Sequence, residues 1–468
     1  MSSRVRVLNV TNVLPNQDQG ADYSPPPPPL PGDGLIKLSF MDALFIDRVP
    51  MQRLFFYEGP YVPPFPSLVH SLQTSLAAVL AVFIPLAGKL AYRPSTGDVV
   101  VDCSRGAVAS GVKFVEAEYS GSIDDMRRLA VGDEHNTEAL MQLGPVLDAG
   151  RLPVPVLAVQ VTRPAVGDGH SAVVGVAIHH AVADGLSVWR FMRTWSAVSQ
   201  AGWQAVSRLE PPTFDRTAIR YPGAEEAARK ILHAIAPTLP VARLPSLCTP
   251  PDQRRRSFLL RADEIQSVKQ QILAQSEAIG ETLDTHPSTF VAVSSLVWTS
   301  IVLAKNLDPT ADAYYLVPVD LRRRLVPPVD ERYFGNCVAP CFARATVRDL
   351  CDDGAGLARA AAAVRDAVRA ATEGDPLRGV DGWLETFAAV PTERFTRTGS
   401  SHRFMAYDTD FGWGAPSRVE LMSVFVRELV LLLGAENGGV QVTIALDHAQ
   451  MEGFAANLLR VSGQRNKA

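Results

Sequence analysis

The residues best suited to chemistry in this sequence are two adjacent histidines, His179 and His180, followed by the aspartate Asp184. They come directly after Ser171–Ile178, an apolar run of small and β-branched residues that predicts a buried strand. The pattern of Trp189–Trp195 predicts a helix after them. The three polar residues therefore lie on a strand-to-helix connection. There, a rigid strand can hold a reactive side chain while the loop leaves it open to substrate.

Three interpretations of these residues are open on chemistry alone. His180 can act as a general base, because imidazole titrates close to neutral pH. His179, His180 and Asp184 also offer three metal ligands, although no further set of histidines or acids stands out as their partner. Both histidines can instead be buried residues that hydrogen-bond the backbone. Adjacent strand residues point to opposite faces, so a regular strand cannot direct both histidines at one substrate.

The sequence offers no evident nucleophile to work with these histidines. It lacks a G-x-S-x-G elbow, and its five cysteines are scattered. An odd, scattered set of cysteines predicts neither a disulfide framework nor a zinc site, and it fits a reducing compartment. The stretch Asp410–Gly414, DFGWG, lacks the G-x-G-x-x-G layout of a dinucleotide-binding loop. A base without a nucleophile favours direct attack by an activated hydroxyl or amine of the substrate.

Composition narrows the classes of protein further. The 468 residues are 47% hydrophobic with a net charge of −4, which predicts a globular chain of two or three domains. A nucleic-acid-binding protein typically carries an excess of basic residues, which this net charge does not indicate. The sequence has neither a signal-peptide layout nor an apolar window of about 18 residues, so we expect a cytoplasmic protein without a membrane partner. The run Pro25–Pro29 predicts an extended surface loop, with a motif for a proline-binding domain as the alternative.

Strand and helix patterns mix along the whole chain, which predicts an α/β protein with two comparable domains. The predicted strands are Val5–Val13, Gln52–Tyr57, Val99–Asp102, Val154–Thr162, Ala172–Ile178, Ser257–Leu260, Tyr314–Val319, Ser423–Leu433 and Val440–Leu446. The predicted helices are Pro66–Leu80, Val188–Ala201, Ala224–Ile235, Ala262–Ser276, Ser288–Leu303, Asp349–Glu373 and Gln450–Leu459. Between the halves, Glu210–Pro251 is rich in proline, alanine and charge and predicts a long crossover linker.

Two motifs together identify a family resemblance. His180–Gly185 resembles the HxxxD signature of the plant BAHD acyl-CoA-dependent acyltransferases, and Asp410–Gly414 matches their DFGWG motif residue for residue. The two motifs stand in the family's order and more than two hundred residues apart. The likeness extends over nearly the whole chain and includes Pro85–Gly88, Pro212–Arg216, Val319–Arg322 and Tyr333–Cys337.

The resemblance implies a particular architecture. It implies two chloramphenicol-acetyltransferase-like domains, each a mixed β-sheet flanked by helices. Residues 1–205 would form the domain with the HxxxD motif, residues 206–255 the crossover linker, and residues 256–468 the domain with the DFGWG motif. The active site would lie in a solvent channel, with acyl-CoA entering from one face and the acceptor from the other. We expect a monomer with no permanently bound cofactor and no metal, and with acyl-CoA as co-substrate.

The resemblance also assigns roles to the motif residues. His180 would be the general base that deprotonates the acceptor hydroxyl for attack on the thioester, without a covalent enzyme intermediate. Spacing alone would make Asp184 the partner that orients His180. In the family this aspartate instead pairs with an arginine, for which Arg322 is the matching residue, and supports the loop. The DFGWG residues would be architectural, with glycines that allow close backbone approach; they are Asp410, Gly412, Trp413 and Gly414.

Further matches narrow the substrate. The cysteine in Tyr333–Cys337 resembles the clade that acylates anthocyanin and flavonoid glucosides, and so does Leu38–Asp42 followed by Gln52–Tyr57. The resemblance therefore favours transfer of a malonyl group from CoA to a sugar hydroxyl of a phenolic or flavonoid glycoside. The alternatives are a hydroxycinnamoyl-CoA-dependent acyltransferase acting on a phenolic glycoside, another alcohol or an amine, and a non-catalytic binding protein of the same family.

Two parts of the donor site stay open. Shikimate-specific relatives carry Thr-Ser-Trp where this chain has Gly399–Ser401, so shikimate and quinate are disfavoured as acceptors. A hydroxyl of Ser400 or Ser401 is one option for steadying the oxyanion on the acyl-CoA side. A malonyl donor needs a cation for its free carboxylate, best an arginine. The candidates are Arg163, Arg190 and Arg397.

Overall fold

A computed structural model describes residues 3–16, 30–131, 137–167, 169–202, 210–242, 252–281, 286–422 and 428–462. The chain divides into two compact units. Unit 1 consists of Met1–Cys248, Leu325–Cys337 and Ala406–Phe425, and unit 2 of Thr249–Arg324, Val338–Met405 and Val426–Ala468. The proline run Pro25–Pro29 lies outside the described residues.

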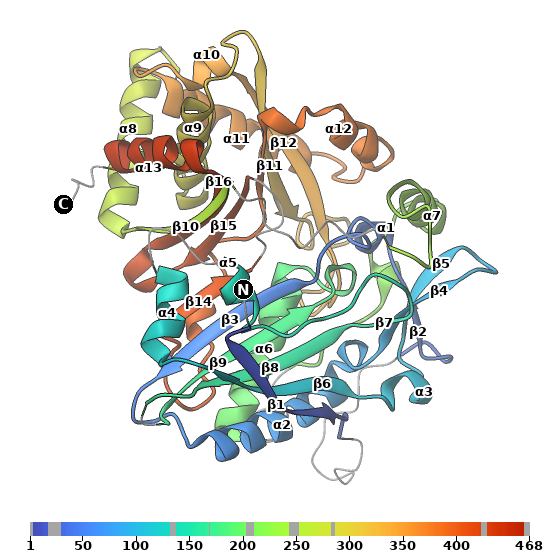
Figure 1. Cartoon of the computed structure of the whole chain (residues 1–468). Coiled ribbons are helices and arrows are strands. Elements are labelled where there is room, and N and C mark those ends of the chain that lie inside the picture. The colour runs from blue at the N-terminus through green and yellow to red at the C-terminus, as the bar shows by residue number, and fades with distance from the viewer. Residues whose placement is uncertain are drawn as a thin grey trace. The chain divides into compact units, whose positions relative to one another are not determined.

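Unit 1 is built around a six-stranded sheet with the strand order β1-β6-β8-β9-β3-β14. Its strands are β1 (Val5–Val13), β3 (Met51–Glu58), β6 (Val112–Tyr119), β8 (Leu157–Pro164), β9 (Ser171–Ile178) and β14 (Arg418–Leu421). β6 and β8 pair in parallel and the other neighbours are antiparallel, so the sheet is mixed. Every residue of β9 is buried between β8 and β3 (Figure 1), which confirms the buried strand predicted before the histidines.

The residues of β3 alternate between the two faces of this sheet, as a strand requires. Leu54 and Phe56 join a buried apolar cluster on one face. Phe55 points to the other face, where its ring packs edge-on against Trp189 with the centroids 6.0 Å apart. Trp189 belongs to α6 (Gly185–Ala201), so this helix covers the second face next to β3. The predicted helix after the histidines is thereby confirmed.

The remaining elements of unit 1 surround this sheet. Its other helices are α1 (Phe40–Ala43), α2 (Phe65–Val82), α3 (Arg105–Val108), α4 (Ile123–Val131), α5 (Thr137–Met141) and α7 (Ala224–Ile235). A second sheet has the order β2-β5-β4-β7, formed by β2 (Leu35–Lys37), β4 (Lys89–Arg93), β5 (Asp98–Asp102) and β7 (Val154–Pro155). The bounds of α7 are those predicted for the one helix of the linker.

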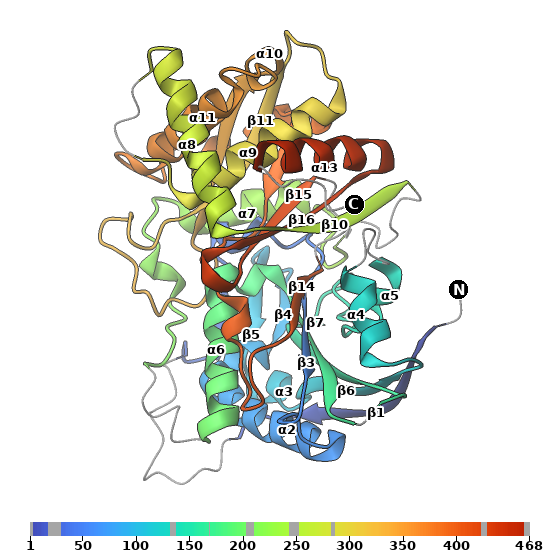
Figure 2. The ribbon, with the colours of Figure 1, turned by 90° about the vertical axis from the view of Figure 1, so that its left-hand side faces the viewer.

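Helix α2 is the one helix within the described ranges whose length and apolar composition would let it cross a membrane. More than half of it, 56%, is buried in the structure. It packs against α6 (Figure 2). There the Trp195 indole N–H donates to the Ser75 hydroxyl at 3.0 Å. A buried core helix passes the same test of length and composition, so this is weak evidence for a membrane span. The predicted lack of a membrane partner stays a prediction.

Unit 2 is built around a second mixed sheet, with the order β10-β16-β15-β13-β11-β12. Its strands are β10 (Gln253–Leu260), β11 (Asp312–Asp320), β12 (Val338–Thr346), β13 (Phe395–Thr398), β15 (Leu429–Gly434) and β16 (Val440–Asp447). Its helices are α8 (Ala262–Ala278), α9 (Thr289–Lys305), α10 (Val347–Leu350), α11 (Gly356–Thr372), α12 (Trp383–Ala389) and α13 (His448–Ser462). Residues of α8, α9, α11 and α13 form one buried cluster with the sheet. Figure 2 labels these four helices beside the strands of unit 2.

The fold class is therefore the predicted one, an α/β chain with mixed sheets flanked by helices. Three predicted elements differ from the structure in their bounds. The predicted strand Val154–Thr162 is divided into β7 and β8, and the predicted helix Asp349–Glu373 is interrupted between Leu350 and Gly356. The predicted strand Ser423–Leu433 is described only in its second half. β15 begins at Leu429, and residues 423–427 lie outside the described part. The predicted ranges 1–205, 206–255 and 256–468 are continuous, whereas unit 1 also takes Leu325–Cys337 and Ala406–Phe425 from the second half. As domain boundaries those ranges stay a prediction.

Candidate active site

The two histidines are separated by a change of backbone direction at the end of β9. His179 still has extended backbone, and the 3₁₀ turn His180–Val182 begins directly after it. The His179 ring is fully buried and its Nδ1 accepts the Ala181 N–H at 3.2 Å. Burial lowers the pKa of His179 to about 3, so this ring is neutral and part of the core. The two histidines therefore lie in different surroundings, and His179 has a structural role in the core.

His180 is the more accessible of the two rings. Its side chain is half-buried, and it stacks on Phe45 with centroids 3.9 Å apart and ring planes 3° from parallel. Its buried Nδ1 has no hydrogen-bond partner among the described residues. Burial lowers the pKa of His180 to about 4, and the positive charge of Arg53 adds to this effect. At neutral pH the ring is therefore uncharged and able to accept a proton.

Asp184 holds the loop through the backbone. One carboxylate oxygen accepts the Ser187 N–H at 2.9 Å and so caps the first turn of α6. The other accepts the Cys337 N–H at 3.1 Å, which ties the loop to a segment far along the chain. Because Nδ1 of His180 has no partner in the described part, Asp184 does not orient the ring as in a triad. These contacts support the structural role expected for Asp184.

The expected partner of Asp184 falls in the other unit. Arg322 belongs to unit 2, where its Nη1 lies 2.9 Å from Oδ1 of Asp320. Its guanidinium is almost fully buried. The pairing of Asp184 with Arg322 stays a prediction.

A polar network that the residues alone did not reveal supports the backbone of His180. The Asn336 amide donates to the His180 carbonyl and to Oδ1 of Asp42, both at 2.9 Å. Asp42 is fully buried, and its Oδ2 accepts Nε of Arg216 at 2.8 Å. The network joins α1, the turn of His180 and two distant segments. Arg216 and Asn336 belong to two stretches that match the family, Pro212–Arg216 and Tyr333–Cys337. The sequence alone did not indicate what these stretches do.

Gly335, which has no side chain, leaves room for the Arg216 guanidinium of this network. The Arg216 guanidinium donates to the Phe334 carbonyl at 2.5 Å and to the Val182 carbonyl at 3.4 Å. A Cβ on Gly335 would lie 2.7 Å from the carbon at the centre of that guanidinium, closer than atoms can approach. Arg216 is held on several sides and cannot move aside cheaply. Glycine is therefore required beside this arginine.

The DFGWG motif forms a tight turn in the same unit as His180. One carboxylate oxygen of Asp410 accepts the N–H groups of Gly412, Trp413 and Gly414 at 2.7, 2.9 and 2.9 Å. The Tyr57 ring packs edge-on against Trp413 at 5.3 Å, which fixes the turn against β3. Both glycines have a positive φ, 100° and 95°. A Cβ on Gly412 would meet Gln200 at an ordinary contact distance of 3.5 Å, and one on Gly414 would meet nothing within 4 Å. The architectural role is supported, but the glycines serve backbone conformation rather than close approach.

The serines expected on the acyl-CoA side lie in unit 2. The Ser400 hydroxyl donates to the Leu432 carbonyl and accepts the Leu432 N–H, both at 2.7 Å. Its proton is thus directed into the sheet. Ser401 is half-buried, and its Oγ accepts the Arg403 N–H at 3.2 Å. Binding of acyl-CoA by Ser400 and Ser401 stays a prediction, with Ser401 the freer of the two.

The arginines named for a malonyl carboxylate are already engaged. Arg163 pairs with Glu118 at 2.8 Å, at the end of β8 that lies farther from His180. Arg190 donates to the carbonyls of Glu331 and Glu210 at 2.9 and 3.1 Å. The Arg397 guanidinium lies 4.2 Å from the Phe395 ring centroid, in unit 2. In unit 1, neither Arg163 nor Arg190 offers a guanidinium to a ligand beside His180.

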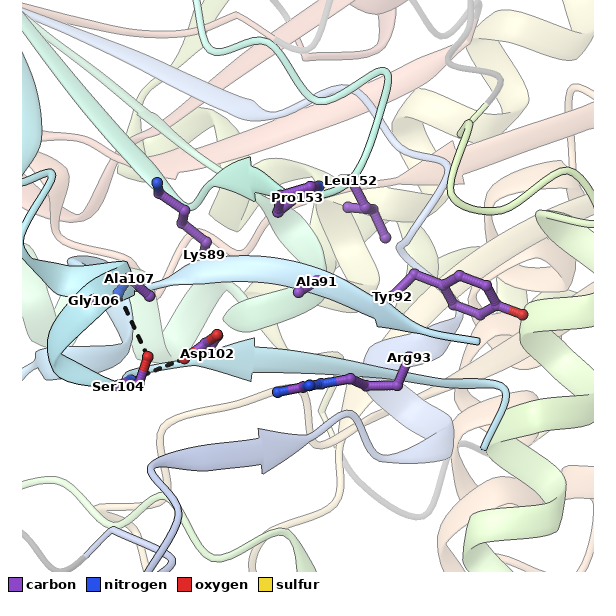
Figure 3. A pocket seen from close by; sticks show the side chains of 10 residues that line it. All are labelled: Lys89, Ala91, Tyr92, Arg93, Asp102, Ser104, Gly106, Ala107, Leu152 and Pro153. Carbon is purple, nitrogen blue, oxygen red and sulfur yellow. Dashed lines mark hydrogen bonds between the residues drawn. The ribbon is translucent and has the colours of Figure 1, made fainter. Parts of the chain in front are cut away.

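A cavity of about 480 Å³ lies over the small sheet of unit 1 (Figure 3). It is lined by Lys89, Ala91, Tyr92, Arg93, Asp102, Ser104, Gly106, Ala107, Leu152 and Pro153. None of the predicted site residues contributes to it. Within the described ranges, no three histidine, cysteine, aspartate or glutamate residues are grouped to hold a metal ion.

Comparison with known proteins gives the chain its relatives. The family model described as the Transferase family matches residues 26–459. The chain is 28% identical to phenolic glucoside malonyltransferase 1 of Arabidopsis thaliana, over 97% of this chain and 96% of the relative. It is 26% identical to malonyl-coenzyme:anthocyanin 5-O-glucoside-6'''-O-malonyltransferase of Salvia splendens, over 95% and 96%.

Solved structures share the fold. Vinorine synthase superposes with a TM-score of 0.74 at 20% identity, covering 98% of each chain. TRI101 of F. sporotrichioides, solved with coenzyme A and T-2, gives a TM-score of 0.61 at 17% identity, over 89% of this chain and 96% of that one. With the family model matching most of its length, the chain belongs to the Transferase family of BAHD acyltransferases and is an acyltransferase.

Proposed function

We propose that this protein transfers a malonyl group from malonyl-CoA to a sugar hydroxyl of a phenolic or flavonoid glycoside. The observation that carries the proposal is His180, an uncharged ring presented at the end of a buried strand and held by Phe45 and Asn336. The names of the relatives supply the substrate class. The cytoplasmic location and the monomeric state expected from the sequence belong to this proposal.

The proposed reaction is a direct displacement. His180 takes the proton of the acceptor hydroxyl while the hydroxyl oxygen attacks the thioester carbon of acyl-CoA. The tetrahedral intermediate collapses, the carbon–sulfur bond breaks, and the CoA thiolate takes the proton back from the His180 imidazolium. The ester and free CoA leave, and the ring returns to its neutral form. No enzyme group becomes acylated.

The low pKa of His180 suits a proton that stays on the enzyme only briefly. An imidazolium with a pKa near 4 is a strong acid beside a thiolate, whose ordinary pKa is about 8.5. The return of the proton to the leaving sulfur is therefore strongly downhill. The same low pKa makes the first proton transfer difficult until bond formation to carbon is well advanced.

Turnover with two donors tests the proposal. The purified protein is assayed with malonyl-CoA and with coumaroyl-CoA, each against the same phenolic glucoside. We expect a malonylated sugar and free CoA in equal amounts. Turnover with coumaroyl-CoA alone would refute the malonyl donor and favour the hydroxycinnamoyl alternative. Turnover with neither donor, while both still bind, would favour a non-catalytic binding protein.

A further inference from the structure

Arg53 is a buried cation in an apolar row. It lies on β3 in the row that includes Phe55, on the face covered by α6. Only 7% of its surface is exposed. Burial lowers its pKa to about 10, which still leaves it charged at neutral pH. A charge in this place calls for an anionic partner, because buried charges are normally paired.

The described residues do not supply that partner. Among the described residues, the one hydrogen bond of the Arg53 side chain runs from Nη2 to the Met51 sulfur, at 3.7 Å. Its guanidinium carbon lies 5.4 Å from the Trp189 ring centroid. Its buried Nε has no hydrogen-bond partner in the described part of the chain. Within the same ranges, no carboxylate forms a salt bridge with it. A sulfur and an aromatic face leave a guanidinium's donors largely unused.

Two other arginines of unit 1 with largely enclosed side chains, Arg216 at 9% and Arg418 at 20% exposed, each have a carboxylate partner. Arg216 bonds Asp42 at 2.8 Å, and Arg418 bonds Glu420 within the sheet. In both cases the chain itself supplies the carboxylate that neutralises the enclosed guanidinium. Arg53 departs from this pattern, which indicates that its carboxylate comes from outside the chain.

The position of Arg53 relates it to His180. Arg53 pairs with Val176 across the sheet, and Met51 pairs with Ile178, the last residue of β9. The turn of His180 follows within two residues of that end. The charge of Arg53 is close enough to act on the His180 ring and lower its pKa. An anion bound by Arg53 would thus lie next to the proposed base.

We propose that Arg53 binds the free carboxylate of the malonyl donor and so selects an anionic acyl group. This inference rests on the proposed function. In a malonyl group one methylene separates the carboxylate from the thioester carbon, so both must lie close to the base. A guanidinium can grip a carboxylate with two parallel hydrogen bonds, which fixes its direction as well as its charge. Arg53 would thereby orient the thioester carbon towards the acceptor oxygen.

The test compares the affinity of the protein for two acyl-CoA donors. Dissociation constants are measured by calorimetry for malonyl-CoA and for acetyl-CoA, with the wild type and with Arg53→Met. We expect the wild type to prefer malonyl-CoA, and Arg53→Met to lose about 100-fold in malonyl-CoA affinity because the carboxylate loses its charged partner. Binding of acetyl-CoA should change by no more than about threefold, since that donor has no carboxylate. Arg53→Lys keeps the charge and should recover part of the preference.

Arg163→Met is the matched control. Arg163 also lies over an aromatic ring, that of Phe65 at 5.3 Å, but it pairs with Glu118 at the far end of the sheet. Its loss should leave both dissociation constants unchanged. An unchanged ratio of the two constants in Arg53→Met and Arg53→Lys would overturn the inference, as would an equal loss for both donors. A wild type that turns over only coumaroyl-CoA would instead refute the proposed function.

Discussion

At the scale of single residues, the low pKa of His180 sets the conditions for proton transfer. Burial lowers that pKa to about 4, and stacking on Phe45 fixes the plane of the ring. The sequence could indicate this histidine because an apolar run ends at it. It could not indicate the pKa, since that depends on burial and on Arg53, which is distant in the sequence.

The acid limb of the pH profile should report this pKa. We expect kcat/KM to fall at low pH with an apparent pKa near 4, because the free enzyme loses its base when the ring is protonated. The measurement is kcat/KM from pH 3.5 to 8, with each sample returned to pH 7 to confirm that activity recovers. A limb near the ordinary histidine value of 6.5 would show that burial does not govern the ring.

The burial of Arg53 could not be predicted from the sequence pattern around it. The stretch Gln52–Tyr57 predicts a strand, which the structure confirms, and a charged residue in a strand is normally assigned to the exposed face. Here both faces of β3 are buried, so Arg53 is enclosed although its neighbours alternate as expected. The sequence offers Arg163, Arg190 and Arg397 as equal candidates, because it does not show which arginine is buried beside His180.

At the scale of elements, segments far apart in the chain hold the loop of His180. Asp42 of α1, Asn336 and Arg216 form one buried network around its backbone. Local patterns predicted β9, α6 and α7 because each depends on its own residues. The network was not predictable in that way, because its three polar residues are far apart in the sequence and come into contact only in the folded chain.

Breaking the network should destabilise unit 1. Asp42→Ala leaves the buried Arg216 without its carboxylate, and loss of one partner of a buried ion pair costs about 3–5 kcal/mol. The check is the free energy of unfolding from urea titration. The control is Glu226→Ala, which removes an exposed pair with Lys230 within α7 and should leave stability unchanged. Equal stability of the Asp42 variant and the control would contradict the assigned role.

Gly335 gives a second test of the same contact. Gly335→Ala places a Cβ 2.7 Å from the Arg216 guanidinium carbon, and overpacking of this kind costs about 1–3 kcal/mol. Thermal melting should therefore shift to a lower temperature. Gly106→Ala is the control, because a Cβ there has no neighbour within 4 Å. A melting temperature equal to that of the control would mean that Arg216 can move aside.

At the scale of the whole molecule, the buried histidines make stability depend on pH. His179 and His180 have pKa values of about 3 and about 4 in the folded protein, against an ordinary value of 6.5. As the pH falls below 6.5, the unfolded chain binds protons that the folded chain does not. Folding stability therefore decreases with acidification between about pH 6.5 and 4. Urea midpoints measured across this range check the direction, and His179→Gln should flatten the slope.

The division of the chain also belongs to this scale. Composition and motif order predicted two mixed-sheet α/β domains, and the fold class is confirmed. The sequence did not reveal that Leu325–Cys337 and Ala406–Phe425 join unit 1. Both segments follow stretches of unit 2 along the chain, so only their contacts with His180 loop residues and β3 show where they belong.

Replacement of His180 tests the central claim most directly. His180→Ala and His170→Ala are assayed with malonyl-CoA and the phenolic glucoside, and their melting temperatures are compared with that of the wild type. His170 is a histidine of the same unit, just before β9, with Nδ1 hydrogen-bonded to the Val62 carbonyl at 2.8 Å. We predict a fall in kcat of about 10²–10⁴-fold for His180→Ala, with a folded protein and with His170→Ala unaffected. Turnover by folded His180→Ala at the wild-type rate would contradict the account.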